Sequence, residues 1–441
     1  MNRFFGQADG YDFPKHVYAR LDSAEPSGDG ASLLTFDAIE ADAVDTIADI
    51  SQIRAARPGS PIASATLCAV TIASSDLAVS ALDDSESEQG GWHQLYLDYE
   101  AGGPALVYPS LQAPGRPAYV RALQHVSYQK AADLDLAFSL DDSLSDRLQI
   151  EAAISRDSIE YVTVYDVGQG GACGLNGRHG FPQLYFDFGG GVLAHKPTYP
   201  AALTDFCFTE KPVVVLSHWD WDHWSSADRF TAATALTWIA PNQKIGPIHA
   251  AFAAMVVANG RLLIWPSGLA LAQNAQTTIR IRKCTGSGRN HSGLAAEVDG
   301  PNGDLPILLP GDARYSAIPN ALATLYASIV VPHHGADMKN AAVPESPMHP
   351  FGRLVYSCAG VNNFGHPRAV TKKTHELAGW SHNPPASAGV ARFTYHRSPQ
   401  GLGHVGIGWS GGLKGKAMPC STQKNVPGIL QTACNLAPCQ D

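Results

Sequence analysis

The residues best suited to chemistry lie in one short segment, Ser217-His218-Trp219-Asp220-Trp221-Asp222-His223. Four possible metal ligands, His218, Asp220, Asp222 and His223, fall within six positions and directly follow the apolar run 213–216. In extended chain, alternate residues face one side, so His218 and Asp220 point the same way. A turn would then let the next pair point elsewhere. Imidazole and carboxylate suit Zn²⁺, Mn²⁺ or Fe²⁺, so this segment predicts a loop that binds two metal ions.

A centre with two ions needs a ligand between them, and Asp312 is the best candidate. It follows the apolar run 307–309, and Gly311 lets the backbone turn so that the carboxylate points off the sheet edge. The pair His333-His334 follows the run 329–331 and supplies further imidazole. One of these two histidines would complete the metal shell, and the other would contact or protonate the leaving group. Which is the ligand stays open.

Two more histidines are weaker candidates. His366, in Asn363-Phe364-Gly365-His366-Pro367, follows another apolar run and could be a metal ligand, a proton donor or a substrate contact. His291 lies between the metal loop and Asp312. We expect it to be a core or substrate-facing histidine rather than a ligand.

The elements that would hold these side chains are short apolar runs ending in polar or Gly-rich turns. They are 161–165, 184–186, 213–216, 307–309, 329–331 and 354–356. Runs this short and apolar are typical of strands buried on both faces. Helix candidates lie between them at 226–236, 248–258 and 317–326. The pattern predicts an α/β layered sandwich with its ligands at the strand ends.

Charge is distributed unevenly along the 441 residues. Residues 1–155 hold 9 Lys+Arg and 23 Asp+Glu, a net charge of −14, whereas the rest of the chain has a net charge of +5. This change indicates a domain boundary near 155, with an acidic N-terminal region of unknown role, a domain at 156–410 and a C-terminal tail at 411–441. The segment 22–30 has the composition of a loop.

These motifs together resemble the metallo-β-lactamase superfamily, whose hallmark loop is H-x-H-x-D-H. The chain is most similar to the soluble hydrolase domain of ComEC-type competence proteins and their free-standing relatives. The resemblance covers residues 160–400, and its motifs occur in the family's order: Asp166-Val167-Gly168-Gln169-Gly170, Phe186-Asp187-Phe188-Gly189, His218-x-Asp220-x-Asp222-His223, Leu309-Pro310-Gly311-Asp312, Val331-Pro332-His333-His334-Gly335 and Asn362 to Pro367.

The resemblance implies a four-layer αβ/βα sandwich and hydrolysis at two divalent ions, Zn or Mn, by a metal-bound hydroxide. His218 and Asp220 would hold one ion, Asp222 and His223 the other, and Asp312 would bridge them. Asp222, His334 and His366 are the expected catalytic residues. An Asp at position 220 in place of the second His adds a hard oxygen ligand, which favours Mn²⁺.

The sequence also departs from the family pattern. Gly171 stands where the family has an acidic residue, and Trp224 replaces a small residue after His223, which puts the substrate-side wall of the site in question. The family's Asp at position 187 is usually structural. The competence proteins carry membrane segments, whereas this chain has no uninterrupted apolar run of 18 residues.

The leading function is therefore a phosphodiesterase or nuclease whose partner is a phosphodiester in a nucleic acid or a nucleotide-like molecule. The alternatives are hydrolysis of a non-phosphate ester, lactone or amide on the same metals, and metal binding without turnover. Residues 280–283 alternate apolar and basic, so Arg280 and Arg282 would share a strand face, either an ordinary solvated one or a phosphate-binding one on which the acidic N-terminal region docks. With no secretory start and no disulfide framework, a cytoplasmic, membrane-free protein is expected.

Overall fold

The computed structural model describes residues 2–5, 11–26, 32–76, 91–142, 145–155, 158–273, 278–339, 341–349, 351–380, 390–397, 401–409, 417–419 and 433–435. Most of the predicted tail 411–441 lies outside these residues. Two short strands are described there, β21 (Ala417–Pro419) and β22 (Ala433–Asn435), and they pair antiparallel. Among the described residues, no helix has the length and apolar character needed to cross a membrane.

The N-terminal part of the chain forms a closed antiparallel barrel with strand order β1-β2-β3-β5-β6-β4. Its strands are β1 (His16–Pro26), β2 (Ser32–Glu40), β3 (Leu67–Ala73), β4 (Trp92–Asp98), β5 (Ala105–Tyr108) and β6 (Arg116–His125). Alternate residues of these strands, such as Val17, Ala19 and Leu21, fill the interior. The prediction of a loop at 22–30 is wrong for Asp22 to Pro26, because pairing with β2 extends β1 through them.

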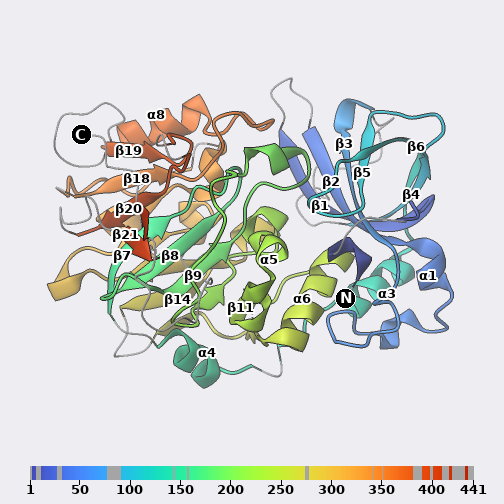
Figure 1. Ribbon diagram of the computed structural model, residues 1–441, viewed down its shortest axis with the longest axis horizontal. Coiled ribbons are helices and arrows are strands. Elements are labelled where there is room, and N and C mark those ends of the chain that lie inside the picture. The colour runs from blue at the N-terminus through green and yellow to red at the C-terminus, as the bar shows by residue number, and fades with distance from the viewer. Residues whose placement is uncertain are drawn as a thin grey trace.

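Three short helices accompany the barrel. α1 (Ala41–Asp45) lies between β2 and β3, and α3 (Tyr128–Ala137) and α4 (Arg147–Ile154) connect β6 to the rest of the chain. Ser127 and Asp146 cap α3 and α4 by accepting hydrogen bonds from the backbone of Lys130 and Gln149. Figure 1 shows the barrel on one side of a larger α/β body, with α3 below the barrel near α1, and α6 on the side of the body that faces it.

Two seven-stranded sheets build the larger body. The first has the order β12-β11-β10-β9-β8-β7-β20 and contains β7 (Ile159–Val164), β8 (Ala172–Gly177), β9 (Pro182–Phe188), β10 (Val213–Val215), β11 (Thr237–Pro241), β12 (Arg261–Trp265) and β20 (Val405–Gly408). The second runs from β13 to β19 in chain order: β13 (Leu271–Gln273), β14 (Ile279–Lys283), β15 (Leu294–Val298), β16 (Ile307–Leu309), β17 (Ser328–Val330), β18 (Arg353–Tyr356) and β19 (Val390–Phe393). The six predicted strands are all present, and the prediction of an α/β chain is confirmed.

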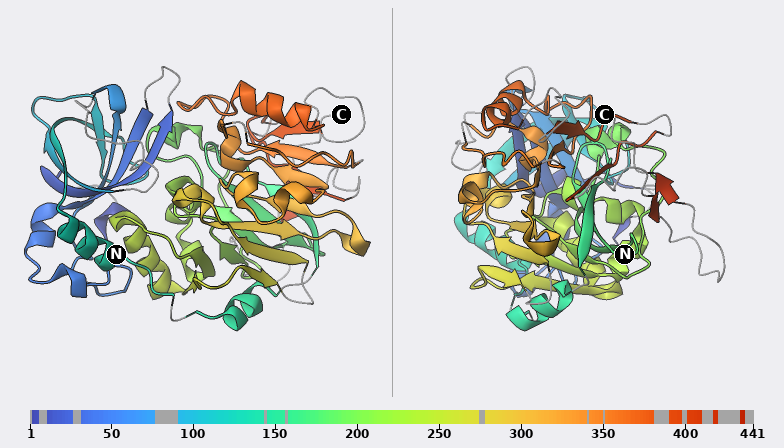
Figure 2. Two further views of the ribbon diagram at one scale, coloured as in Figure 1. Left: turned by 180° about the vertical axis from the view of Figure 1, so that it is seen from behind. Right: turned by 90° about the vertical axis from the view of Figure 1, so that its left-hand side faces the viewer.

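One hydrophobic core joins the two sheets, because it combines residues such as Val162 and Val215 of the first sheet with Ile281 and Leu309 of the second. Helices α5 (Ser226–Arg229) and α6 (Pro247–Asn259) lie on the first sheet's side of the body, and α8 (Ala369–Leu377) lies at the second sheet (Figure 2). The metal loop follows β10, and Asp312 and the His333-His334 pair follow β16 and β17.

The helix predictions succeed only in part. The predicted helix 248–258 corresponds to α6. The predicted helix 226–236 is the single turn of α5 followed by a 3-10 helix at Thr231–Ala235. The prediction of a helix at 317–326 is wrong. The chain forms 3-10 turns at Tyr315–Ala317 and Ala321–Ala323, because Pro319 and the left-handed Asn320 (φ 66°) lie between them.

The barrel and the body share a second hydrophobic core. It includes Phe5 and Ile39 from the N-terminal part and Trp224 and Phe252 from the body. Buried polar contacts cross the same boundary, since Asp37 of β2 accepts hydrogen bonds from the backbone of Ile248 at 2.8 Å and His249 at 3.3 Å, at the start of α6. The barrel is therefore packed against the body through both apolar and buried polar contacts.

Candidate metal centre

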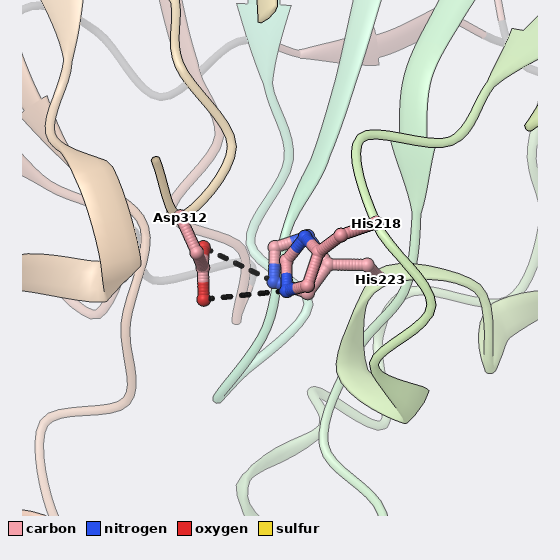
Figure 3. A group of neighbouring side chains, drawn as sticks. All are labelled: His218, His223 and Asp312. Carbon is pink, nitrogen blue, oxygen red and sulfur yellow. Dashed lines mark ion pairs between the residues drawn. The ribbon is translucent and has the colours of Figure 1, made fainter. Parts of the chain in front are cut away.

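Three side chains from the two sheets meet at the centre of the site: His218, His223 and Asp312 (Figure 3). Nε2 of His223 lies 3.2 Å from Oδ1 of Asp312, and Nε2 of His218 lies 3.7 Å from Oδ2. The backbone at Gly311 adopts φ 57°, the turn that the sequence predicts. All three ligand atoms lie within 4.8 Å of one another, so these residues could hold a metal ion.

A second group of the same kind consists of Asp222, His223 and His334. Nε2 of His334 lies 3.2 Å from Oδ2 of Asp222 and 3.8 Å from Oδ2 of Asp312. His223 belongs to both groups, and Asp312 contacts histidines of both. The predicted ligands Asp220 and His333 lie beside the groups. Oδ2 of Asp220 is 3.2 Å from Nε2 of His218, and Nε2 of His333 is 3.7 Å from Asp312.

The hydrogen bonds of the three histidines fix which ring nitrogen faces the centre. Nδ1 of His334 lies 2.8 Å from the carbonyl of Ser357, which can only accept, so Nδ1 carries the proton. Nδ1 of His223 lies 2.9 Å from the Asp187 carboxylate. The Ser217 hydroxyl donates to Asp187 and so accepts from Nδ1 of His218.

The opposite nitrogens fit a metal ion. Nε2 of His218, His223 and His334 are buried and form no hydrogen bond. Because their Nδ1 atoms face hydrogen-bond acceptors, each Nε2 points toward the carboxylates, where either a proton or a metal ion can bind it. A buried nitrogen left this way costs free energy unless something positive binds it. Histidines oriented through Nδ1 by carbonyl or carboxylate partners are the usual arrangement of metal ligands.

The electrostatics of the site also favour a cation. Burial raises the pKa of Asp222 and Asp312, but nearby histidines outweigh it and hold both pKa values below the usual range. Burial lowers the pKa of His223 and His334, yet the carboxylates raise both pKa values above normal. The carboxylates are therefore charged, and they attract either protons or a metal ion to the histidine nitrogens.

A buried polar chain joins the barrel to the metal loop. Arg289 ion-pairs with Asp22 of β1, lies 3.1 Å from Oδ1 of Asp220, and donates to the carbonyl of Trp219 at 2.8 Å. His249 of α6 accepts from the Trp224 indole through Nδ1, so its Nε2 carries the proton and donates to Oδ1 of Asp22 at 2.8 Å.

A pocket opens beside the ligands, between the barrel and the body. One side consists of Asp22, Ser23, Glu25, Leu33, Thr35 and Thr71, and the other includes residues 192–195, Phe364 and His366. Glu25 approaches His333, with 3.1 Å between Oε1 and Nε2. His366 lies within this pocket, and burial together with the neighbouring His333 and His334 lowers its pKa to about 2. His366 is therefore a neutral ring with one N–H donor and one acceptor nitrogen, suited to contact substrate oxygens or bind a metal ion rather than to act as a general acid.

Other predicted residues lie outside the centre. His291 belongs to neither ligand group, and its Nδ1 accepts from the backbone of Arg314 at 3.4 Å. Trp224 does not line the pocket; it stacks on Phe252 at 4.1 Å between ring centroids. The barrel, and not Trp224, forms the wall of the pocket on the substrate side.

Sequence reasoning missed three titratable residues of this pocket: Asp22, Glu25 and His195. The first two lay in the segment interpreted as a loop. His195 stands in a 3-10 helix after β9, where no motif marks it. Its ring lies 4.5 Å from that of Phe364, and burial lowers its pKa to about 4.

Comparison with known proteins identifies no family for this chain. No family model matches the chain, and no curated protein matches it. The crystal structure of a possible metal-dependent hydrolase from Veillonella parvula DSM 2008 is similar at 13% sequence identity and a TM-score of 0.29, over 50% of this chain and 92% of that one. A likeness this distant carries no functional conclusion.

Proposed function

We propose that the chain is a metal-dependent hydrolase whose residues 156–410 form a metallo-β-lactamase-like sandwich, and that it cleaves phosphodiesters. One observation carries the proposal: three buried Nε2 atoms, from His218, His223 and His334, converge on Asp222 and Asp312 without hydrogen bonds. Such a donor set suits Mn²⁺ or Zn²⁺. Asp312, which contacts histidines of both groups, is the residue suited to bridge two ions.

The residues around the ligands supply the rest of the mechanism. Divalent ions bound here would stabilise negative charge on the scissile group and provide a nucleophile from water at neutral pH. His218, Asp220 and Asp312 would hold one ion, and Asp222, His223 and His334 the other. His333 and His366, which line the pocket, would position the oxygens of the substrate.

Metal analysis combined with an activity panel tests this function. We expect up to two transition-metal ions per chain and hydrolysis of bis(p-nitrophenyl) phosphate with Mn²⁺. Asp222→Ala and Asp312→Ala should each lose metal and activity while the fold survives, since both residues lie on loops. Asp304→Asn, a change distant from the ligands, serves as the control. Full activity in Asp312→Ala, or turnover of a lactone with no cleavage of any diester, would contradict the proposal.

A further inference from the structure

The barrel forms one wall of the metal pocket. Strand β1 brings Asp22, Ser23 and Glu25 to it, and neighbouring strands add Leu33, Thr35 and Thr71. The buried contacts of Asp22 with Arg289, and of Asp37 with α6, hold this wall in place. The backbone of Leu193, across the pocket, donates to the carbonyl of Leu111 at 3.1 Å, next to the barrel. A substrate in this pocket would therefore lie between the barrel and the body.

Carboxylates line both sides of the pocket, and His333 lies among them. Among the described residues that line it, none is Lys or Arg, and five are acidic: Asp22, Glu25, Asp220, Asp222 and Asp312. Asp22 is neutralised by Arg289, and the last three surround the candidate metal positions. Glu25 is the carboxylate of the wall itself. Its side chain is 15% exposed and lies 3.1 Å from Nε2 of His333, so a substrate group would share Glu25 with that imidazole.

The two arginines of the candidate phosphate-binding strand face are already paired. Arg280 and Arg282 share a face of β14, as predicted, but both donate at 2.9 Å to the buried carboxylate of Glu297. Arg280 also pairs with Asp299. These contacts make the face an ordinary structural one, so it offers no phosphate-binding surface. Nucleic-acid sites depend on Lys and Arg contacts to several phosphates, and this pocket has none among its described residues.

We infer that the barrel wall, through Glu25, selects small phosphodiesters whose group beyond the scissile phosphate is uncharged or cationic, and rejects nucleic-acid strands. The inference rests on the proposed function and specifies its substrate class. A carboxylate in the wall attracts an ammonium group and repels a further phosphate across the pocket. Polar Ser23, Thr35 and Thr71 beside it can accept hydrogen bonds from ammonium or hydroxyl groups.

Three diesters whose terminal groups differ in charge test the selectivity that we assign to the barrel wall. They are the p-nitrophenyl phosphates of 2-aminoethanol, 1-propanol and 3-hydroxypropionate, used with the full-length, Mn²⁺-loaded protein. We expect kcat/KM to fall in that order, by about tenfold between the first and the last. A single-stranded oligonucleotide should be cleaved far more slowly than any of them. In Glu25→Gln the aminoethyl preference should shrink several-fold, whereas the exposed control Glu100→Gln should keep it.

Binding separates this inference from the proposed function. Calorimetry should show 2-aminoethylphosphonate binding the metal-loaded protein more tightly than 2-carboxyethylphosphonate, whether or not any diester is hydrolysed. Equal affinities, or a preference unchanged in Glu25→Gln, would overturn the role of the wall. Efficient cleavage of the oligonucleotide would overturn the substrate class. Loss of metal from Glu25→Gln would show that Glu25 is a ligand instead.

Discussion

Nδ1 of His223 lies 2.9 Å from Oδ2 of Asp187, and this contact ties a candidate metal ligand to the end of β9. The same carboxylate accepts from the backbone and the hydroxyl of Ser217, at 2.6 and 2.8 Å. Asp187 itself adopts a left-handed backbone conformation, with φ 60°. Since that conformation costs free energy in a non-glycine residue, the three hydrogen bonds must hold it in place.

Asp187→Asn should therefore weaken metal binding without unfolding the protein. If the amide oxygen stays on the Ser217 backbone N–H, the NH₂ group faces both the Ser217 hydroxyl and Nδ1 of His223, so His223 loses its fixed orientation. Losses of about 10–100-fold in metal affinity are typical when such an orienting partner is removed. Titration with Mn²⁺ or Zn²⁺ measures the change, with Asp304→Asn as the control. Unchanged affinity would show that Ser217 alone orients the loop.

The two adjacent histidines should respond differently to alanine. His334 belongs to a ligand group and is held by Ser357, whereas His333 contacts Glu25 and lies at the edge. We expect His334→Ala to lower metal content. His333→Ala should keep its metal and lose turnover. Elemental analysis and diester hydrolysis on both proteins make the comparison. If both variants keep metal and activity, neither residue serves the site.

The positive charge of Arg289 should be essential for the stability of the folded protein. Its side chain is 11% exposed and faces two carboxylates, Asp22 and Asp220. Arg289→Gln would leave both without a cation, and removing one partner of a buried ion pair costs roughly 3–5 kcal/mol of unfolding free energy. A single nitrogen, Nη1, makes every contact to Asp22, Asp220 and Trp219, so Arg289→Lys should recover part of the loss. Urea unfolding of both variants tests this, and equal stability would contradict it.

The sequence was most informative where local pattern decides structure. Apolar runs such as 213–216 form buried strands because a short segment that is apolar on both faces is stable only inside a covered sheet. His218 and Asp222 lie at the predicted edge of the sheet because the loop that carries them directly follows β10. The prediction of a helix at 317–326 was wrong because Pro319 and Asn320 interrupt the helix locally, and both residues are visible in the sequence.

The barrel wall could not be predicted from the sequence. Asp22 and Glu25 lie nearly 200 residues before the metal loop, and only the closure of six strands brings them to the pocket. No spacing rule connects such distant positions. The net charge of the N-terminal region indicated a separate domain. It did not indicate that Asp22 pairs with Arg289 where the barrel packs against the body.

Stability against acid should depend on His404, a buried histidine remote from the metal centre. Its Nδ1 accepts from the backbone of Asp166 at 2.8 Å, and its ring lies 5.1 Å from that of Tyr165. Burial lowers the pKa of His404 from 6.5 to about 3. Below pH 6.5 the unfolded chain therefore takes up a proton that the folded chain refuses, so stability falls as pH drops toward 3.

The size of this effect can be measured with one substitution. His404→Asn keeps an acceptor for Asp166 but cannot take up the proton. Since each pKa unit corresponds to about 1.4 kcal/mol, the wild-type protein should lose up to about 2 kcal/mol more than the variant between pH 7 and pH 5. Urea unfolding at both pH values gives the two losses. The exposed His179→Asn should behave like the wild type, and an equal loss in His404→Asn would show that other groups govern acid stability.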